Sequence, residues 1–401
     1  MKNFIFSLCI LLSGYCLFGQ CGDRYLDVQF EEVEVETVVY SDFTNFEMDI
    51  YTPIGDSHLS RPVVVFAFGG GFVIGNRKAK LMIDLCTDFA RRGYVAASID
   101  YTLADDVSVL SDSVAIFSIV AEAVADGKGA IRYFRKSHNE GNPYGIDPNQ
   151  IWIGGNSAGA VLSLHLAFID ETDELPEFVE QVIADSGGFE GNRGNDGYSS
   201  TVRGVISLAG AISNLQWIDE NEEEVLVLCH GDKDGIVDFN CDFPFSSADS
   251  IETSAVLCGS NQINERANEM GLSSYLKVFE GYDHVPWQIG SNRDSIYFET
   301  FQFAKNLLYE HLDCNVSKII EFDDFQVSIF PNPTSQQIYV STYESDLISN
   351  IKIFNLEGKL LKSIDAMSNM VTLDDLPSTS GLYLVKVQVG NNTHVQKLII
   401  Q

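Results

Sequence analysis

The sequence predicts two folded units: an α/β domain with a mostly parallel sheet, and a small all-β sandwich that follows it. Short apolar runs alternate with longer amphipathic stretches from about residue 33 to residue 311, which is typical of strands joined by crossover helices. Several of these runs are apolar throughout, as expected when helices cover both faces of a sheet. From residue 325 onward only short β-type runs occur, separated by turn residues, and this pattern favours a sandwich.

The elements of both units can be placed in chain order. The predicted strands of the α/β domain are Val33–Val39, Phe46–Tyr51, Val63–Phe68, Tyr94–Ile99, Ile151–Ile153, Val202–Leu208, Val225–Leu228 and Tyr275–Phe279. Its predicted helices include Lys80–Arg91, Ser111–Arg135, Ala158–Phe168, Asn261–Met270 and Arg293–Tyr309. The predicted strands of the tail are Gln326–Phe330, Gln337–Ser341, Ile351–Phe354, Leu360–Ile364, Val371–Leu373, Gly381–Val389 and Val395–Ile400.

The N-terminal segment is typical of an export signal. Lys2 gives the segment a positively charged N-terminus, Phe4–Phe18 is an apolar run, and Gly19-Gln20 provides a small residue for a cleavage site. This run is shorter than the ~18 apolar residues that a membrane span needs, and no later stretch reaches that length. We therefore expect a signal peptide at 1–20, a first domain at 21–315, a linker at 316–324 and a second domain at 325–401, without a transmembrane segment.

The charge of the chain limits its partners. The sequence holds 25 Lys and Arg against 57 Asp and Glu, a formal net charge of −32. Binding to nucleic acid or to anionic lipid would need a basic face, so neither is expected. The tail from residue 325 has five Lys and six acidic residues, so nearly all of the negative charge lies in the first domain. Such an imbalance suggests two modules with different roles.

The cysteines suit an exported protein. Six of the eight remain after the expected signal, and an even number in such a chain permits up to three disulfides. Cys241 and Cys258 flank one local segment and form the first expected pair, and Cys21 with Cys86 is a second, weaker expectation. Cys229 lies in an apolar strand and is expected to be a buried thiol.

The main candidate for chemistry is Gly155-Asn156-Ser157-Ala158-Gly159. It follows an apolar strand and opens a helical stretch, and glycines on both sides allow a tight strand-to-helix turn. Such a turn pushes the serine out of the sheet edge, near a helix N-terminus where backbone N–H groups favour a developing anion. Ser157 is therefore the candidate nucleophile.

A glycine triplet follows an earlier strand, in Phe68-Gly69-Gly70-Gly71-Phe72. Three glycines present backbone N–H groups without side chains in the way, and acyl transfer needs two or three such donors around its tetrahedral intermediate. The segment has neither the continuation of a phosphate-binding loop nor a dinucleotide-binding pattern. It is either an anion cradle or a flexible turn.

A nucleophilic serine needs a base, and that base needs an acid to orient it. His284 follows a predicted strand, on a loop at the edge where the sites of parallel sheets gather. Asp234 follows another strand and is the preferred acid, with Asp232 as the alternative. The order Ser157, Asp234, His284 is the nucleophile–acid–base order of serine hydrolases with an α/β sheet.

Other sites are less well defined. The loop at 184–200 is rich in glycine, and we expect it to line or cover an acyl pocket together with Phe72, Trp217 and Trp287, unless it is a plain surface insertion.

Asp232, Asp234 and Asp238 lack the full spacing of a calcium loop, and no His or Cys cluster has a zinc spacing. The sequence predicts no metal and no cofactor.

At residues 40 to 310 the chain resembles α/β-hydrolases of the carboxylesterase and lipase kind. Gly69-Gly70-Gly71-Phe72 resembles their oxyanion-hole motif, and Gly155-Asn156-Ser157-Ala158-Gly159 resembles their nucleophile elbow. The resemblance implies that the backbone N–H groups of Gly70, Gly71 and Ala158 bind the oxyanion. His230-Gly231-x-x-Asp234 looks like the acid motif of the family, which favours Asp234 over Asp232.

Two positions depart from the pattern of the family. Phe68 stands where many related lipases have His, and Asn156 stands where other esterases often have Glu. Neither departure removes a catalytic group.

The tail is similar to the C-terminal sorting domain of the type IX secretion system of Bacteroidetes. The similarity rests on Phe330-Pro331-Asn332-Pro333, Ile351-Lys352-Ile353-Phe354-Asn355, Gly381-Leu382-Tyr383 and the ending Val395–Ile400. It implies a passage through the periplasm and across the outer membrane, with the secretion machinery as a partner, followed by release or attachment at the cell surface.

These features together predict a secreted serine esterase that acts on a small or polymer-linked ester. Three alternatives remain open: a carbohydrate esterase for acetylated or feruloylated plant polymers, a peptidase of the prolyl-oligopeptidase type, and a non-catalytic binding module on a hydrolase scaffold. The peptidase is disfavoured because nothing in the sequence resembles a propeller. The binding module is disfavoured because all the expected chemical positions are filled.

Overall fold

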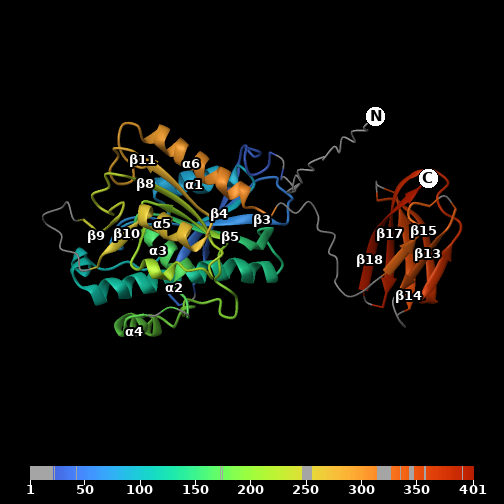
Figure 1. Cartoon of the computed structure of the whole chain (residues 1–401), viewed down its shortest axis with the longest axis horizontal. Coiled ribbons are helices and arrows are strands. Elements are labelled where there is room, and N and C mark those ends of the chain that lie inside the picture. The colour runs from blue at the N-terminus through green and yellow to red at the C-terminus, as the bar shows by residue number, and fades with distance from the viewer. Residues whose placement is uncertain are drawn as a thin grey trace, which may run out of the picture. The chain divides into compact units, whose positions relative to one another are not determined.

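The computed structural model describes residues 21–401 with gaps at 22, 42, 172, 174, 246–254, 314–326, 335, 343–346, 356–357 and 391. The expected signal peptide and linker lie outside the described residues. The chain divides into two compact units, Met1–Cys314 and Asn315–Gln401 (Figure 1).

The first unit is built on an eight-stranded sheet with the order β1-β2-β4-β3-β5-β6-β8-β11. β2 runs antiparallel to both of its neighbours, β1 and β4. The remaining six strands, β4, β3, β5, β6, β8 and β11, are parallel to one another. The strands are β1 (Val33–Val39), β2 (Glu47–Pro53), β3 (Arg61–Ala67), β4 (Val95–Ile99), β5 (Ile146–Asn156), β6 (Gly204–Leu208), β8 (Val225–Gly231) and β11 (Ser274–Phe279). The predicted α/β fold with a mostly parallel sheet is confirmed.

Helices cover both faces of this sheet. α1 (Lys80–Ala90) and α6 (Arg293–Glu310) lie on one face, and α2 (Ser113–Asn139) and α3 (Ala158–Phe168) lie on the other (Figure 1). α5 (Ser260–Met270) connects β8 to β11 and packs against both strands. As a result every residue of β3, β4, β6 and β8 is buried, whereas the edge strand β1 is largely exposed. This burial accounts for the apolar runs in the sequence.

Several short elements were not expected from the sequence. They are the helix α4 (Glu177–Asp185), the turns η1 (Val107–Ser111) and η2 (Leu215–Trp217), and a second sheet of β7 (Ala211–Ile212), β10 (Leu257–Gly259) and β9 (Cys241–Asp242). α4 buries only Val179 and Val182, and strands of two or three residues are too short to show a period. Such elements depend on tertiary contacts more than on local pattern.

The second unit consists of two antiparallel sheets with a core of their own. One sheet has the order β12 (Val327–Phe330), β13 (Ile338–Thr342), β16 (Met370–Leu373). The other has the order β15 (Leu360–Ser368), β14 (Ile348–Phe354), β17 (Gly381–Val389), β18 (Asn392–Ile400). In β17, buried residues alternate with more exposed ones, as in a strand with one face on a core. The predicted all-β tail is confirmed.

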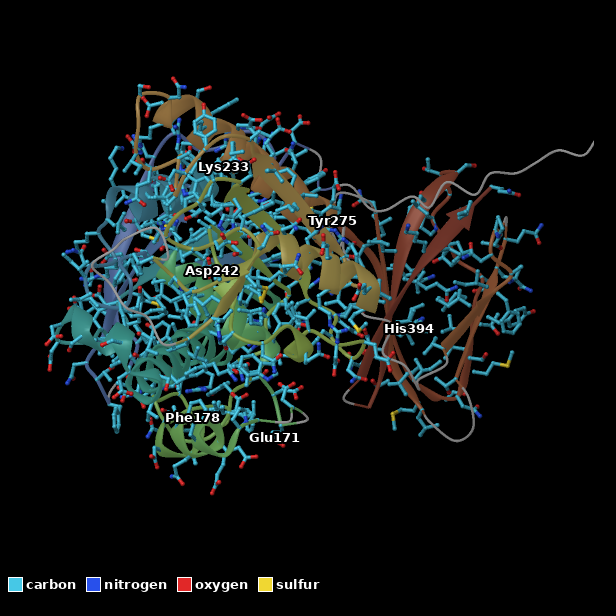
Figure 2. All side chains as sticks on the ribbon, turned by 60° about the vertical axis from the view of Figure 1, so that its left-hand side comes forward. Glu171, Phe178, Lys233, Asp242, Tyr275 and His394 are labelled. Carbon is cyan, nitrogen blue, oxygen red and sulfur yellow. A yellow bond between two sulfur atoms is a disulfide. The ribbon has the colours of Figure 1, made fainter. Side chains whose placement is uncertain are left out.

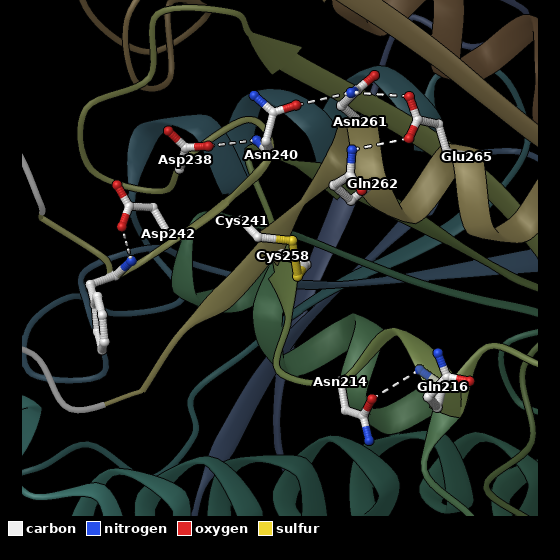
Figure 3. The surroundings of a disulfide bond; sticks show 11 residues. Asn214, Gln216, Asp238, Asn240, Cys241, Asp242, Cys258, Asn261, Gln262 and Glu265 are labelled. Atoms are coloured by element: carbon white, nitrogen blue, oxygen red, sulfur yellow. Dashed lines mark hydrogen bonds between the residues drawn. A yellow bond between two sulfur atoms is a disulfide. The ribbon is translucent and has the colours of Figure 1, made fainter.

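The cysteines follow the sequence expectation in part. Cys241 on β9 and Cys258 on β10 form a disulfide (Figure 3), as predicted. Cys229 is a buried thiol, also as predicted. The second expected pair, Cys21 with Cys86, is wrong, because Cys86 is a buried free thiol on α1. Burial raises the pKa of the Cys86 thiol well above its ordinary value, so this side chain behaves as a small apolar residue.

Replacing Cys241 and Cys258 by serine together is expected to lower the free energy of unfolding by about 3 kcal/mol, because the disulfide closes a loop with a sequence separation of 17 residues. All three tryptophans, at positions 152, 217 and 287, lie in the first unit. Denaturant unfolding followed by tryptophan fluorescence therefore reports on this unit alone. A Cys229→Ser variant is the control for the loss of a thiol. Equal stability of the double variant and the wild type would contradict the prediction.

Candidate active site

Ser157 lies on a sharp turn between β5 and α3. Its backbone has φ 52° and ψ −119°, a conformation that a non-glycine residue rarely adopts and that is associated with functional sites. The turn brings the start of α3 very close to β3, because a Cβ on Gly159 would lie 2.1 Å from the carbonyl oxygen of Ala67. The glycine is therefore required for the approach, and the expected strand–turn–helix geometry around Ser157 is present.

His284 and Asp234 reach Ser157 from two other loops, each of which follows a parallel strand. Nε2 of His284 lies 2.9 Å from Oγ of Ser157, and Nδ1 of His284 lies 2.6 Å from Oδ2 of Asp234. The Asp234 carboxylate can only accept, so the geometry assigns the hydrogen on Nδ1 to the bond with Asp234. Nε2 is then free to accept the hydrogen of the Ser157 hydroxyl. The structure thus brings the three predicted residues together in one hydrogen-bonded row.

The carboxylate of Asp234 is buried and fully hydrogen-bonded. Its Oδ1 accepts the backbone N–H groups of Ile236 and Val237, each at 2.9 Å. Its Oδ2 accepts from Nε2 of His230 at 3.1 Å in addition to His284. Burial alone would raise the pKa of Asp234, but the hydrogen bonds from His230 and His284 outweigh it and hold the pKa well below its ordinary value.

His230 is a part of the site that the sequence did not assign to it. The ring is fully buried, and its Nδ1 lies 2.8 Å from Oγ of Ser260 on α5. Its Nε2 also lies 2.9 Å from the carbonyl oxygen of Val237. Both partners of Nε2 are acceptors, so Nε2 carries the hydrogen and donates to Asp234. The signal in the sequence was the spacing His230-Gly231-x-x-Asp234 itself.

Asp232, the alternative acid, lies elsewhere. Its Oδ1 accepts the backbone N–H of Gly281, so it links the loop after β8 to the loop after β11. It makes no hydrogen bond with His284. Of the two candidates, Asp234 is the one that contacts the imidazole.

The glycine triplet passes directly beside Ser157. A Cβ on Gly69 would lie 3.1 Å from Cβ of Ser157, so this loop forms one wall of the site. Gly70 has φ 142° and its backbone lies so close to Ile74 that no side chain would fit. Among the described residues, the backbone N–H groups of Gly70, Gly71 and Ala158 donate no hydrogen bond to another protein atom. These three N–H groups are therefore available to a ligand.

Asn156, the residue before the nucleophile, connects the turn to the loop that carries His284. Its Oδ1 accepts from Nε1 of Trp287 at 2.8 Å, and its Nδ2 donates to Oε1 of Gln288 at 2.9 Å. Trp287 is fully buried by these contacts and by Phe279. It therefore supports the loop of His284 and does not line the cavity beside Ser157, in contrast to the sequence expectation.

An apolar cavity of about 80 Å³ opens beside Ser157. Gly71, Phe72, Ser157 and Ala158 are among the residues that line it, as expected for Phe72. The rest of its wall comes from η1, α2, α3 and the segments around β9 and β10: Leu110, Ile116, Phe117, Val120, Val161, His165, Ser213, Ile236, Val237, Pro244, Phe245, Ala255 and Leu257. A cavity with this lining suits a hydrocarbon group.

Two further expectations about the cavity are not met. Trp217 is buried behind His165, with its ring edge-on to the imidazole at 5.7 Å between centroids, and does not line the wall. The loop at 184–200 contributes no residue to this cavity. It packs against α2, where Arg132 donates to the carbonyl oxygen of Gly194 and Lys128 donates to that of Phe189, and its Ser186, Gly188 and Phe189 line a second, neighbouring cavity. A glycine-rich sequence indicates a loop but not the surface on which it lies.

Comparison with known protein families identifies two matching regions of the chain. The BD-FAE family matches residues 48–211, a span that contains the glycine triplet and Ser157 and ends before Asp234 and His284. The secretion system C-terminal sorting domain matches residues 328–401. The protein is an esterase-like α/β-hydrolase with a secretion sorting tail. Its tail marks the hydrolase for export by type IX secretion to the cell surface or beyond.

Curated proteins that resemble the hydrolase include plant methylesterases. The probable isoprenylcysteine alpha-carbonyl methylesterase of Oryza sativa subsp. japonica is 34% identical over 137 residues, which cover 33% of this chain and 28% of that protein. A probable isoprenylcysteine alpha-carbonyl methylesterase of Arabidopsis thaliana is 28% identical over 202 residues, which cover 50% of this chain and 35% of that protein. The matches thus span only about a third of the length of these relatives.

Solved structures of similar fold include an esterase of Thermogutta terrifontis with propionate bound. It has a TM-score of 0.50 and 24% identity, and the match covers 69% of this chain and 94% of that chain. At this identity the likeness concerns the fold. Among the described residues of the hydrolase, no helix is long and apolar enough to cross a membrane, and no group of three or more His, Cys, Asp or Glu could hold a metal ion.

His165 on α3 is held neutral inside the hydrolase. Its Nδ1 lies 2.8 Å from the carbonyl oxygen of Val161, and its Nε2 accepts the backbone N–H of Ser213 at 3.3 Å. Burial is the main influence and lowers the pKa of His165 to about 4, although the bond to Val161 acts in the opposite direction. In the unfolded chain this imidazole takes up a proton near its ordinary pKa of about 6.5.

We expect protonation of His165 in the unfolded chain to lower the free energy of unfolding by about 3 kcal/mol as the pH falls from about 6.5 to about 4. In this window the unfolded chain binds the proton and the folded protein does not, so acid favours unfolding. Denaturant unfolding by tryptophan fluorescence at both ends of the window gives the loss. A His165→Gln variant, which cannot titrate, should lose less. Equal losses in the two proteins would show that the prediction is wrong.

Proposed function

We propose that the hydrolase is a secreted serine esterase that cleaves carboxylic esters through Ser157, His284 and Asp234. The observation that carries the proposal is the continuous row of hydrogen bonds from Ser157 through His284 to Asp234, at 2.9 Å and 2.6 Å, beside an apolar cavity. Structural ion pairs rarely place a serine hydroxyl at the end of such a row, on a strained turn and next to unpaired N–H groups.

The first half of the reaction forms an acyl-enzyme. Oγ of Ser157 attacks the ester carbonyl while Nε2 of His284 takes the hydroxyl proton. Asp234 keeps the imidazole in the required tautomer and stabilises the imidazolium. The negative charge that develops on the carbonyl oxygen is bound by the N–H groups of Gly70, Gly71 and Ala158, and removing one donor of this kind typically lowers the rate ~10²–10³-fold. Collapse of the intermediate transfers the proton from His284 to the departing alkoxide, which leaves as the alcohol.

The second half releases the acid. Water enters the position that the alcohol has left, and His284 removes a proton from it as it attacks the acyl carbonyl. The second tetrahedral intermediate uses the same three N–H groups. Its collapse returns the proton from His284 to Oγ of Ser157 and frees the carboxylic acid. All of these steps use groups of the chain itself, and no cofactor takes part.

A second substrate class is a methyl ester, in which the alcohol part is small and the acid part is large. The names of the curated relatives describe methylesterases of a cysteine that carries an isoprenyl group. The carbohydrate esterase and peptidase alternatives differ in their substrates and not in the three residues, so only a substrate panel separates them.

Covalent labelling tests the proposal directly. The secreted protein is treated with a fluorophosphonate probe, digested, and the labelled peptide is identified by mass spectrometry. We expect a single label on Ser157 and none in a Ser157→Ala variant. In parallel, hydrolysis of p-nitrophenyl acetate, acetyl-xylan, methyl ferulate, an S-prenylcysteine methyl ester and a prolyl amide is measured. A folded wild type that neither takes the label nor hydrolyses any ester of the panel would falsify the esterase assignment.

A further inference from the structure

A second cavity, of about 40 Å³, lies next to the cavity at Ser157, on the side of α2. The two cavities share three wall residues, Phe117, Val120 and His165. Beyond them the second cavity is lined by apolar residues of α2 and α4 such as Ala121, Val124, Val179 and Val182, and also by Lys128 and Ser186. Phe117, Val120 and His165, called here the partition, therefore separate two apolar spaces.

The cavity at Ser157 suits the acyl part of an ester better than the alcohol part. This step rests on the proposed function. The alcohol has to leave the site before water attacks, whereas the acyl group stays attached to Ser157 until the second step. A pocket that ends at a wall can hold the group that stays. Phe117, Val120 and His165 stand between this cavity and the next one, so the acyl chain that it can hold is one that ends at these three residues.

The partition is held in place from both sides. The ring of His165 is fixed by Val161 on its own helix and by Ser213, whose Oγ lies 2.9 Å from Nε2. The ring of Phe117 packs edge-on against Phe178 of α4, at 5.5 Å between centroids. Phe178 lies on α4 at the edge of the first unit (Figure 2) and lines neither cavity. A longer acyl chain would have to displace one of these fixed rings.

The imidazole of His165 also determines how polar the wall between the two cavities is. It lies about two helical turns along α3 from Ser157 and lines both cavities. Both ring nitrogens are engaged by protein partners, and the ring meets the cavities with its carbon edge or face. The wall is therefore apolar in effect on both sides, and the space behind it suits methylene groups.

We propose that Phe117, Val120 and His165 set the acyl-chain length of the esterase, and that the cavity behind them is a latent site for the distal methylene groups of a straight medium-length acyl chain. In the wild type the partition restricts the substrate to short acyl groups. Removing one wall residue joins the two spaces and lets a longer chain extend from Ser157 towards α4.

The test compares p-nitrophenyl butyrate with p-nitrophenyl octanoate, which differ by four methylene groups. We expect the wild type to prefer butyrate. In a Phe117→Ala variant the ratio of kcat/KM for octanoate to that for butyrate should rise on the order of 10²-fold. The reason is that each methylene of octanoate that becomes buried raises its kcat/KM ~4-fold. A Val120→Ala variant should change the ratio in the same direction, and it provides the test if the first variant does not fold.

Two control variants separate a steric effect from a general loosening of the site. Phe178→Ala removes the ring that supports Phe117 but leaves Phe117 itself in place, so its octanoate-to-butyrate ratio should rise much less than that of Phe117→Ala. Adding Ala121→Phe to Phe117→Ala fills only the second cavity, so octanoate turnover should fall again while butyrate turnover is kept.

The outcomes distinguish the inference from the proposed function. Butyrate hydrolysis with an unchanged ratio in both wall variants contradicts the inference and leaves the esterase assignment standing. The inference is also overturned if Phe178→Ala raises the ratio as much as Phe117→Ala, or if Ala121→Phe does not reverse the gain. A wild type that hydrolyses neither ester and takes no fluorophosphonate label contradicts the proposed function, and the inference with it.

Discussion

Replacing Ser157 by alanine is expected to lower kcat for p-nitrophenyl acetate by about 10⁶-fold, the loss observed when a serine nucleophile is removed from a complete triad. The alanine leaves no group that can form the acyl-enzyme, although Gly70, Gly71 and Ala158 could still bind a developing oxyanion. The variant should therefore still hydrolyse the ester on the order of 10³-fold faster than the uncatalysed reaction in water. The measurement is steady-state hydrolysis with enzyme from a separate preparation for each variant, because traces of wild type would hide a loss of this size.

The matched control for this variant is Ser163→Ala. Ser163 lies on the same helix and is also buried, but its Oγ donates to the carbonyl oxygen of Gly159 and does not contact His284. It should keep nearly full activity. Tryptophan fluorescence should show that both variants fold. If Ser157→Ala retained more than about a hundredth of the wild-type kcat, the nucleophile would have to be another residue.

The frame of the site could be predicted because it depends on short local patterns. The fully apolar runs at Val63–Phe68 and Val225–Leu228 are found as buried parallel strands. The turn at Ser157 follows from two glycines at fixed spacing between a strand and a helix. His284 and Asp234 could be selected because the loops after parallel strands all open at the same edge of a sheet.

Features that depend on contacts between distant segments could not be predicted. The contact between Nδ1 of His230 and Oγ of Ser260 joins residues that are 30 positions apart, and nothing in composition or period indicates it. The wall of the cavity combines residues of η1, α2, α3 and β10, which are far apart in the chain. Trp217 and Trp287 were expected at the cavity because large aromatic rings often line binding sites. Their rings are instead buried behind His165 and Asn156.

Replacing Asp234 by asparagine is expected to lower kcat by about 10⁴-fold, the loss that accompanies this change in a serine protease triad. The amide of asparagine can donate a hydrogen to Nδ1 of His284, which places the ring hydrogen on Nε2. In that tautomer the imidazole cannot accept the proton of Ser157, so the nucleophile is no longer activated. The loss should appear in kcat for p-nitrophenyl acetate with little change in KM, because Asp234 does not line the cavity.

Asp232→Asn is the control for this variant, since Asp232 lies in the same loop but bonds Gly281 and not His284. The two variants should also differ in their response to acid. The pKa of Asp234 is held below its ordinary value in the folded protein, so the unfolded chain binds the proton first and the wild type loses stability as the pH falls below about 4. The stability advantage of the wild type over Asp234→Asn should therefore shrink in that range. If Asp232→Asn lost as much activity as Asp234→Asn, the choice of the acid would have to be reversed.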